Sequence, residues 1–126
     1  MNVIALSYHY ALPFLGQFLL IVASLSYIGA IVSQKPKPFA RAACLFLGLS
    51  YVLLTYAFII SDPTLKIVVD HSSPHTPLAY KIAGVWGGAA GSLHLWVCIL
   101  SAVGCFLKSN QSLRYFALHM VGFILF

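Results

Sequence analysis

The sequence predicts an all-α integral membrane protein with three full transmembrane helices, the start of a fourth, and an N-terminus outside the membrane. Its composition supports this class, because 61% of the 126 residues are apolar, 7% are charged, and the mean hydropathy is +0.95. Long apolar runs suit a bilayer, whereas a soluble domain of this length needs more charge on its surface. The uneven placement of the basic residues predicts the orientation.

Three apolar stretches are long enough to cross a membrane, at about residues 12–32, 39–60 and 85–107, since a spanning helix needs ~20 residues. A fourth stretch, 113–126, begins like a span but is too short to complete one. We therefore expect residues 1–126 to be an N-terminal fragment of a larger membrane domain: a split subunit, a truncated gene product or an excised piece.

Basic residues concentrate in the first and third loops: Lys35, Lys37, Arg41, Lys108 and Arg114. The positive-inside rule places these loops in the cytoplasm or the mitochondrial matrix, and hence the N-terminus outside. The net charge is +5, but the Lys and Arg residues form no basic stripe, so no nucleic-acid partner is expected. A cleaved signal peptide is not favoured, because the first apolar stretch has no basic n-region before it and no A-x-A site after it.

The loop at residues 61–84 is expected to lie in the outer aqueous compartment. It contains three prolines, which we expect to break any helix: Pro63, Pro74 and Pro77. Residues 65–69 (LKIVV) are apolar apart from Lys66 and are expected to form a short strand-like piece. His71 and His75 are predicted to be solvated, with no metal site, because Pro74 interrupts the helix that would bring them together.

The three cysteines, Cys44, Cys98 and Cys105, all fall within predicted spans and form no CxxC pair. Cys98 and Cys105 lie seven residues apart, and a helical rise of ~10.5 Å exceeds the separation that a disulfide permits. We expect all three to be small apolar packing residues.

Two histidines, His94 and His119, are expected at membrane depth, where ionisable residues are functional candidates by default. One hypothesis is haem ligation, and the alternatives are interhelical hydrogen bonding or a polar cavity wall. Their expected depths differ by ~12 Å, which disfavours their binding one iron together. Gln17, in the first span, is expected to hydrogen-bond between helices.

Residues 80–96 (YKIAGVWGGAAGSLHLW) form the most distinctive segment of the sequence. Its glycines form two pairs with a spacing of four: Gly84 with Gly88, and Gly87 with Gly91. We predict that these pairs lie at the start of one helix, where another backbone approaches closely. Trp86 is expected at the membrane interface, and Trp96 deeper, as a packing residue or as a cofactor wall.

The order of residues across 57–100 resembles the N-terminal region of the CcmF/NrfE-type cytochrome c haem lyase subunit. The matching positions are Ala57, Phe58, Asp62, Val68, Ser72, Pro77, Tyr80, Trp86, Gly87, Gly91, Ser92, Leu93, Leu95 and Trp96. The chain departs from the family pattern at Ala89 and Ala90, where the family has His-Glu, and at His94, which interrupts a leucine run. Phe14 replaces an acidic residue of the family.

The resemblance implies a multi-pass protein of the bacterial inner membrane or the mitochondrial inner membrane that takes part in attaching haem covalently to apocytochrome c. It also implies three partners: a haem chaperone, apocytochrome c, and a C-terminal remainder or separate chain bearing the tryptophan-rich WWD segment. The haem ligands of the family lie C-terminal to the matched region, so none carries over here. Haem therefore belongs to the complete assembly, and the chain is not expected to be active alone. The alternatives are a non-enzymatic membrane interaction or scaffold subunit, or an inactive truncated remnant.

Overall fold

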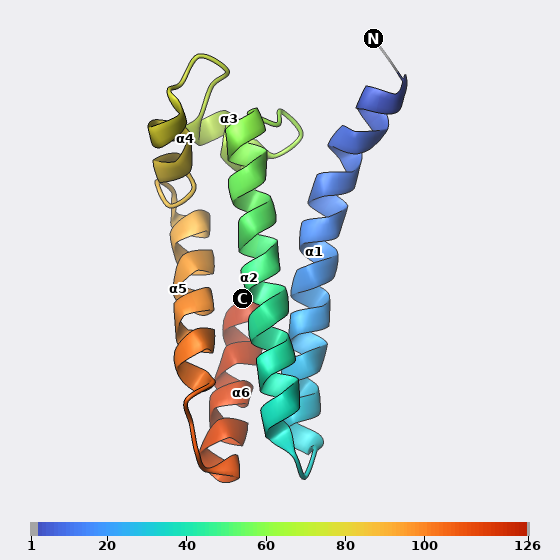
Figure 1. Cartoon of the computed structure of the whole chain (residues 1–126), viewed down its shortest axis with the longest axis vertical. Coiled ribbons are helices and arrows are strands. Elements are labelled where there is room, and N and C mark those ends of the chain that lie inside the picture. Colours follow the sequence, from blue (N-terminus) through green and yellow to red (C-terminus); the bar gives the residue numbers. More distant parts are fainter. Residues whose placement is uncertain (1–2, 126) are drawn as a thin grey trace.

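The computed structural model describes residues 3–125, and the side chains of residues 11–124, and this part of the chain is helical without any strand. The helices are α1 (Val3–Val32), α2 (Pro36–Ile60), α3 (Lys66–His71), α4 (Leu78–Gly84), α5 (Ala89–Gly104) and α6 (Asn110–Leu125). The long helices α1, α2, α5 and α6 stand side by side, and the short helices α3 and α4 lie at one end of the bundle (Figure 1). The predicted all-α class is confirmed.

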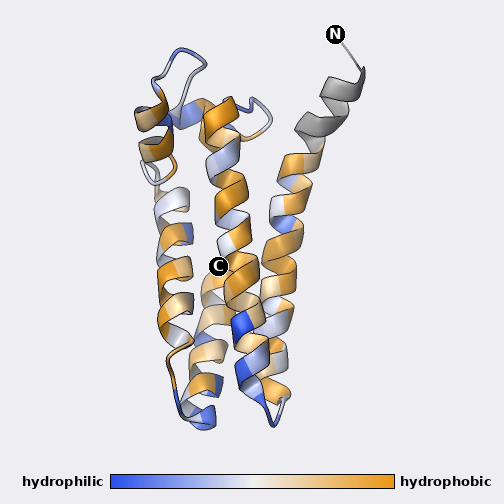
Figure 2. Cartoon of the chain, viewed as in Figure 1, coloured by the Kyte–Doolittle hydropathy of each residue, from blue (hydrophilic) through white to orange (hydrophobic). Residues whose placement is uncertain are grey.

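Hydrophobic residues dominate the long helices, and hydrophilic residues gather at the two ends of the bundle (Figure 2). Among the described residues, two helical segments are long and apolar enough to span a membrane, Ala11–Val32 and Pro36–Ile60. They agree with the first two predicted spans to within three residues. Pro36 begins α2, a position where the missing N–H of proline costs no helical hydrogen bond.

The predicted third span, residues 85–107, is not one straight helix. Only Ala89–Gly104 forms α5, which has 16 residues, and it follows α4 across a break with a bend of 77°. The two helices of the bent pair are long and apolar enough for a span only when they are taken together, so the described residues hold two spanning helices, or three if the pair counts as one. The predicted fourth stretch falls in α6, which also has 16 residues. Three full spans with the start of a fourth therefore remain a prediction.

The outer loop differs from its prediction in two respects. Residues 65–69 form no strand, because Lys66–His71 is the helix α3. The described residues offer no strand with which this segment might pair, and a helix satisfies its backbone hydrogen bonds locally. The expectation that the prolines break any helix in this loop is also wrong, because Pro77 lies at the N-cap of α4 and not inside the helix.

The core consists of two clusters of buried side chains. The larger cluster joins α1, α2, α5 and α6 and is rich in small residues, including Ala23, Ala30, Ala40, Ala43 and Ala117. Small side chains let helix backbones approach closely, which suits packing within a membrane. The smaller cluster, of Ala57, Phe58, Val68 and Val85, joins α2, α3 and the break before α5.

The three cysteines are free and partly buried, and Cys98 Sγ donates to the carbonyl oxygen of Leu47 on α2 at 3.5 Å.

Candidate functional site

The break between α4 and α5, residues 85–88, is a tight turn that we call the glycine turn. Backbone hydrogen bonds close it, from Val85 N to Ile82 O at 3.2 Å and from Gly87 N to Gly84 O at 3.0 Å. On its far side, the Ser92 hydroxyl donates to the carbonyl oxygen of Trp86 at 2.7 Å. Ser92 therefore ties the first turn of α5 back to the bend.

The glycines allow this bend because backbone atoms leave no room for a Cβ at Gly84 and Gly91, and a Cβ at Gly88 would displace a side chain. A Cβ on Gly91 would overlap the carbonyl oxygen of Val85. On Gly84 it would lie 2.9 Å from the carbonyl oxygen of His71, and on Gly88 2.7 Å from the imidazole of His71. The prediction that the glycine pairs open a single helix is wrong, since Gly84 ends α4 and Gly88 precedes α5. The close approach is instead to α3 and to the turn itself.

A second set of contacts holds α3 and α4 against the end of α2. Ser61 caps α2 in the left-handed conformation, with φ of 53°, and Asp62 follows it with its side chain buried. The Asp62 carboxylate accepts hydrogen bonds from Thr64 N at 2.9 Å and from Thr64 Oγ1 at 2.8 Å. Lys81 Nζ, on α4, donates to the carbonyl oxygen of Ile59 at 3.2 Å. Two of the family-motif positions, Pro77 and Tyr80, lie at the start of α4. Pro77 is the N-cap of the helix, and the side chain of Tyr80 is exposed.

His94 lies on α5 and hydrogen-bonds to α2. The Ser50 hydroxyl donates to the carbonyl oxygen of Leu47 at 2.9 Å, so it accepts from Nε2–H of His94 at 2.7 Å. The ring of Tyr51 packs edge-on against the imidazole, with centroids 5.4 Å apart. Of the roles considered for His94, the structure shows the interhelical hydrogen bond.

A cavity of about 160 Å³ lies beside this hydrogen bond, between α1, α2 and α5, and we call it the His94 cavity. Half of its lining residues are leucines, and Gln17, Ser50 and His94 contribute polar groups. Leu65, from the loop before α3, also contributes to it. The structure thus brings Gln17 and His94, which the sequence analysis treated separately, to one cavity.

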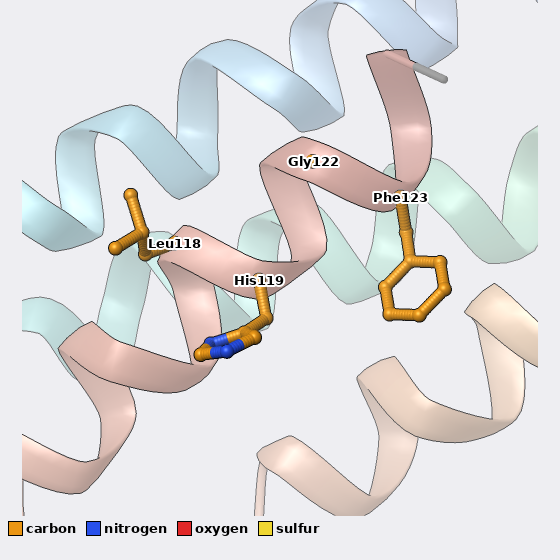
Figure 3. Close-up of a pocket in the computed structure, with 4 residues that line it drawn as sticks. All are labelled: Leu118, His119, Gly122 and Phe123. Atoms are coloured by element: carbon orange, nitrogen blue, oxygen red, sulfur yellow. The ribbon is translucent and has the colours of Figure 1, made fainter.

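His119 lies elsewhere, in a separate groove of about 440 Å³ on α6. Figure 3 shows His119 and Phe123 projecting from the same side of this helix, with Gly122 beside them and Leu118 at the other edge. The imidazole Nδ1–H donates to the carbonyl oxygen of Tyr115, one turn earlier on the same helix, at 2.7 Å. His94 and His119 therefore do not share a cavity.

His94 and His119 are not placed to ligate one haem together. The His94 cavity, at about 160 Å³, is smaller than the ~300–1,000 Å³ typical of sites for drug-sized ligands. The Nε2 atom of His94 is also hydrogen-bonded to the Ser50 hydroxyl. The groove at His119 is walled by residues of one helix only, so it supplies no second axial ligand. Within the described residues, no group of three or more His, Cys, Asp or Glu side chains is placed to hold a metal ion.

The two tryptophans lie on the outside of the described chain. Trp86 is in the glycine turn and is 48% exposed, and Trp96 is on α5 and is 61% exposed. The packing that was one expectation for Trp96 is therefore not made by the described residues of this chain. Neither tryptophan lines the His94 cavity.

Ser50 and Tyr51, the two partners of His94, are functional candidates that the sequence did not predict. A hydroxyl within an apolar span is itself a signal, because serine side chains often hydrogen-bond across membrane helices. The sequence contains this signal, but it does not indicate which helix supplies the partner.

These features define the class of protein as an all-helical membrane protein with a glycine turn near one end. The chain is 39% identical over 80% of its length to CycK of Bradyrhizobium diazoefficiens. It is 35% identical over 91% to NrfE of Haemophilus influenzae, and 32% identical over 61% to CcmF of Escherichia coli. All three are named cytochrome c-type biogenesis proteins. The recognition from sequence is confirmed: the chain is related to the cytochrome c-type biogenesis proteins of the CcmF/NrfE type.

The matched region covers only a small part of these relatives, 16% of CycK, 22% of NrfE and 13% of CcmF. No family model matches the chain. No solved structure matches it either.

Proposed function

We propose that this chain is the N-terminal part of a membrane haem lyase subunit for the maturation of c-type cytochromes. The observation that carries the proposal is the similarity over 80% and 91% of the chain to two proteins named for cytochrome c-type biogenesis. Because the matched region is at most 22% of those relatives, we assign this chain a share of the assembly and not the whole activity. The remaining share, including the haem ligands, belongs to a C-terminal remainder or to a separate chain bearing the WWD segment.

In this proposal the chain lies in a bacterial or mitochondrial inner membrane. Helices α1 and α2 form two spans, the bent pair α4–α5 forms a third, and α6 begins a fourth. The basic loops face inward by the positive-inside rule, so α3, α4 and the glycine turn face outward. This outer end is the part that we assign to docking of the haem chaperone and apocytochrome c.

The contacts within the chain support a positioning role. The hydrogen bond between Ser50 and His94 holds α5 against α2, and Lys81 holds α4 on the end of α2. The glycine turn sets the direction of α5 relative to α4, with a bend of 77°. Each contact fixes where the outer end presents its surface, and none of them needs haem bound to this chain.

Deletion of the chain tests the proposal in the organism that encodes it. We expect loss of covalently bound haem from c-type cytochromes on haem-stained gels, while b-type cytochromes remain in the membrane spectrum. The wild-type chain should restore the stain, and it should co-purify with a WWD-bearing chain where that is separate. Unchanged c-type cytochromes in the deletion strain would refute the proposal.

A second candidate function is a non-enzymatic interaction subunit. Large apolar side chains are exposed along α5, at Leu93, Trp96, Ile99 and Val103. Their spacing of three to four residues places them along one side of a helix, as in an interface with further membrane helices. This candidate predicts association with another membrane protein but normal c-type cytochromes after deletion. An inactive remnant predicts neither.

A further inference from the structure

A polar cavity lies at the basic end of the bundle, where α1 ends and α6 begins, and we call it the Arg114 cavity. Its volume is about 560 Å³. Five polar side chains line it: Gln34, Asn110, Gln111, Arg114 and Tyr115. None of these residues takes part in the contacts assigned to the proposed function, so that function does not account for the cavity.

Arg114 is held in a fixed position at this cavity. Its Nη2 donates to the carbonyl oxygen of Ser33, in the loop after α1, at 2.6 Å. Its Nε is buried and has no hydrogen-bond partner within the described residues. A guanidinium carries five N–H donors in a planar fork that matches a phosphate or carboxylate. Ser33 uses one of them and the N–H at Nε is buried, so three donors remain on the two terminal nitrogens. The anchored side chain is therefore preorganised for an anion.

The charge around the cavity also favours an anion. Lys35, Lys37, Arg41 and Lys108 lie in or beside the same two loops. The only acidic residues of the chain, Asp62 and Asp70, lie beyond the opposite end of α2. The positive end of the α6 dipole adds to the field at Asn110. No carboxylate near the cavity competes for the guanidinium.

An apolar groove continues from the cavity along α6. Leu118 lines both the Arg114 cavity and the groove of about 440 Å³, whose other lining residues are His119, Gly122 and Phe123. Figure 3 shows the residues that line this groove, with Gly122, which has no side chain, between Leu118 and Phe123 on α6. From Arg114 to Gly122 the helix rises ~12 Å, away from the basic end. The Arg114 cavity is therefore continuous with the groove along α6, whose lining is apolar except for His119.

We propose that the Arg114 cavity binds the phosphate of an anionic phospholipid, with one acyl chain in the groove along α6. Phosphate oxygens accept hydrogen bonds from the guanidinium and from the side-chain amides of Gln34, Asn110 and Gln111. Basic pockets between membrane helices are a general means of binding anionic headgroups. Free phosphate shares the head chemistry, but it makes no use of the groove. The proposal is independent of the haem lyase assignment.

The test uses the full chain in nanodiscs that contain phosphatidylcholine and phosphatidylglycerol. Lipid retained after mild detergent extraction is measured by native mass spectrometry. We expect the wild-type chain to retain phosphatidylglycerol selectively, and Arg114→Gln to lower the retained fraction about tenfold, as for loss of ~1.4 kcal/mol. Lys108→Gln is the matched control, because it removes the same charge at the same end without lining the cavity.

Further measurements keep the proposal falsifiable if Arg114→Gln fails to fold. The double variant Asn110→Ala/Gln111→Ala should then lower phosphatidylglycerol retention, and Gly122→Leu should lower it by filling the groove. Equal loss in Lys108→Gln and Arg114→Gln would mean general charge attraction and would overturn the site. Equal retention of phosphatidylcholine would overturn it too, as would displacement by millimolar inorganic phosphate alone.

Discussion

At the scale of single residues, the bend between α4 and α5 depends most directly on Gly91, because this residue has no Cβ. The carbonyl oxygen of Val85 occupies the space that a Cβ would need. Gly48, in the middle of α2, has nothing within 4 Å of the same added atom. The two glycines therefore form a matched pair, one constrained by contact and the other not.

Gly91→Ala should lower the free energy of unfolding by about 1–3 kcal/mol, the usual cost of overpacking. Gly48→Ala should leave the free energy unchanged or raise it by up to about 1 kcal/mol, because alanine favours helix more than glycine does. Reversible unfolding in mixed micelles, followed by tryptophan fluorescence, measures both. Equal stability of the two variants would contradict the account of the glycine turn.

The hydrogen bond between Ser50 and His94 is the second feature at this scale. A double-mutant cycle with Ser50→Ala and His94→Ala should show a favourable coupling of about 0.6 kcal/mol, and up to ~1.7, as for other membrane hydrogen bonds. The same unfolding measurement applies. Purely additive effects of the two substitutions would mean that the bond contributes no stability.

At the scale of elements, α4 is held to α2 by one hydrogen bond from Lys81 and by the packing of Phe58 and Val85. A short helix of 7 residues is not stable by itself, so its position depends on such contacts. The neighbouring helix α3 carries a comparable lysine, Lys66, which pairs with Asp70 at 2.6 Å on the surface. The two lysines differ in what they connect.

Lys81→Met should speed amide hydrogen exchange across α4, because it removes the donor to the Ile59 carbonyl while keeping an unbranched side chain of similar length. Lys66→Met is the control, since exposed ion pairs of this kind contribute ~0–1 kcal/mol. Exchange followed by mass spectrometry distinguishes the two. If α4 exchanges no faster in Lys81→Met than in Lys66→Met, the lysine does not dock the helix.

The elements also show how far the sequence predicts this fold. The two longest helices follow from apolar length alone, and their bounds agree with the predictions to within three residues. Residues 65–69, most of which fall in the short helix α3, were predicted as a strand-like piece, because a short segment with four apolar residues of five is compatible with both structures. The glycine turn was predicted as a straight helix start, since spacing alone does not reveal that Val85 and His71 come so close.

At the scale of the whole molecule, the two ends of the bundle differ in charge. Five of the seven Lys and Arg residues lie in or beside the loops at one end, and both acidic residues lie at the other. This asymmetry is the basis of the proposed orientation. The Arg114 cavity and the glycine turn lie at opposite ends of the bundle, so they are expected on the inner and the outer side of the membrane, respectively.

Single cysteines in a cysteine-free background test this orientation. His75→Cys should react with a membrane-impermeant maleimide added to intact cells or spheroplasts, because residue 75 lies in the proposed outer loop. Gln34→Cys should react only after the membrane is opened. The reverse labelling pattern would invert the topology, and the proposed role of the outer end with it.

The sequence by itself determined the membrane class, the two longest helices, the charge asymmetry and the resemblance to cytochrome c biogenesis proteins. These properties depend on composition, length and the order of residue types, which need no knowledge of distant contacts. Only the tertiary structure decided that the glycines make a turn, that His94 bonds to Ser50, and that His119 lies in another groove. Each of these depends on which helices lie side by side, and local sequence does not specify that.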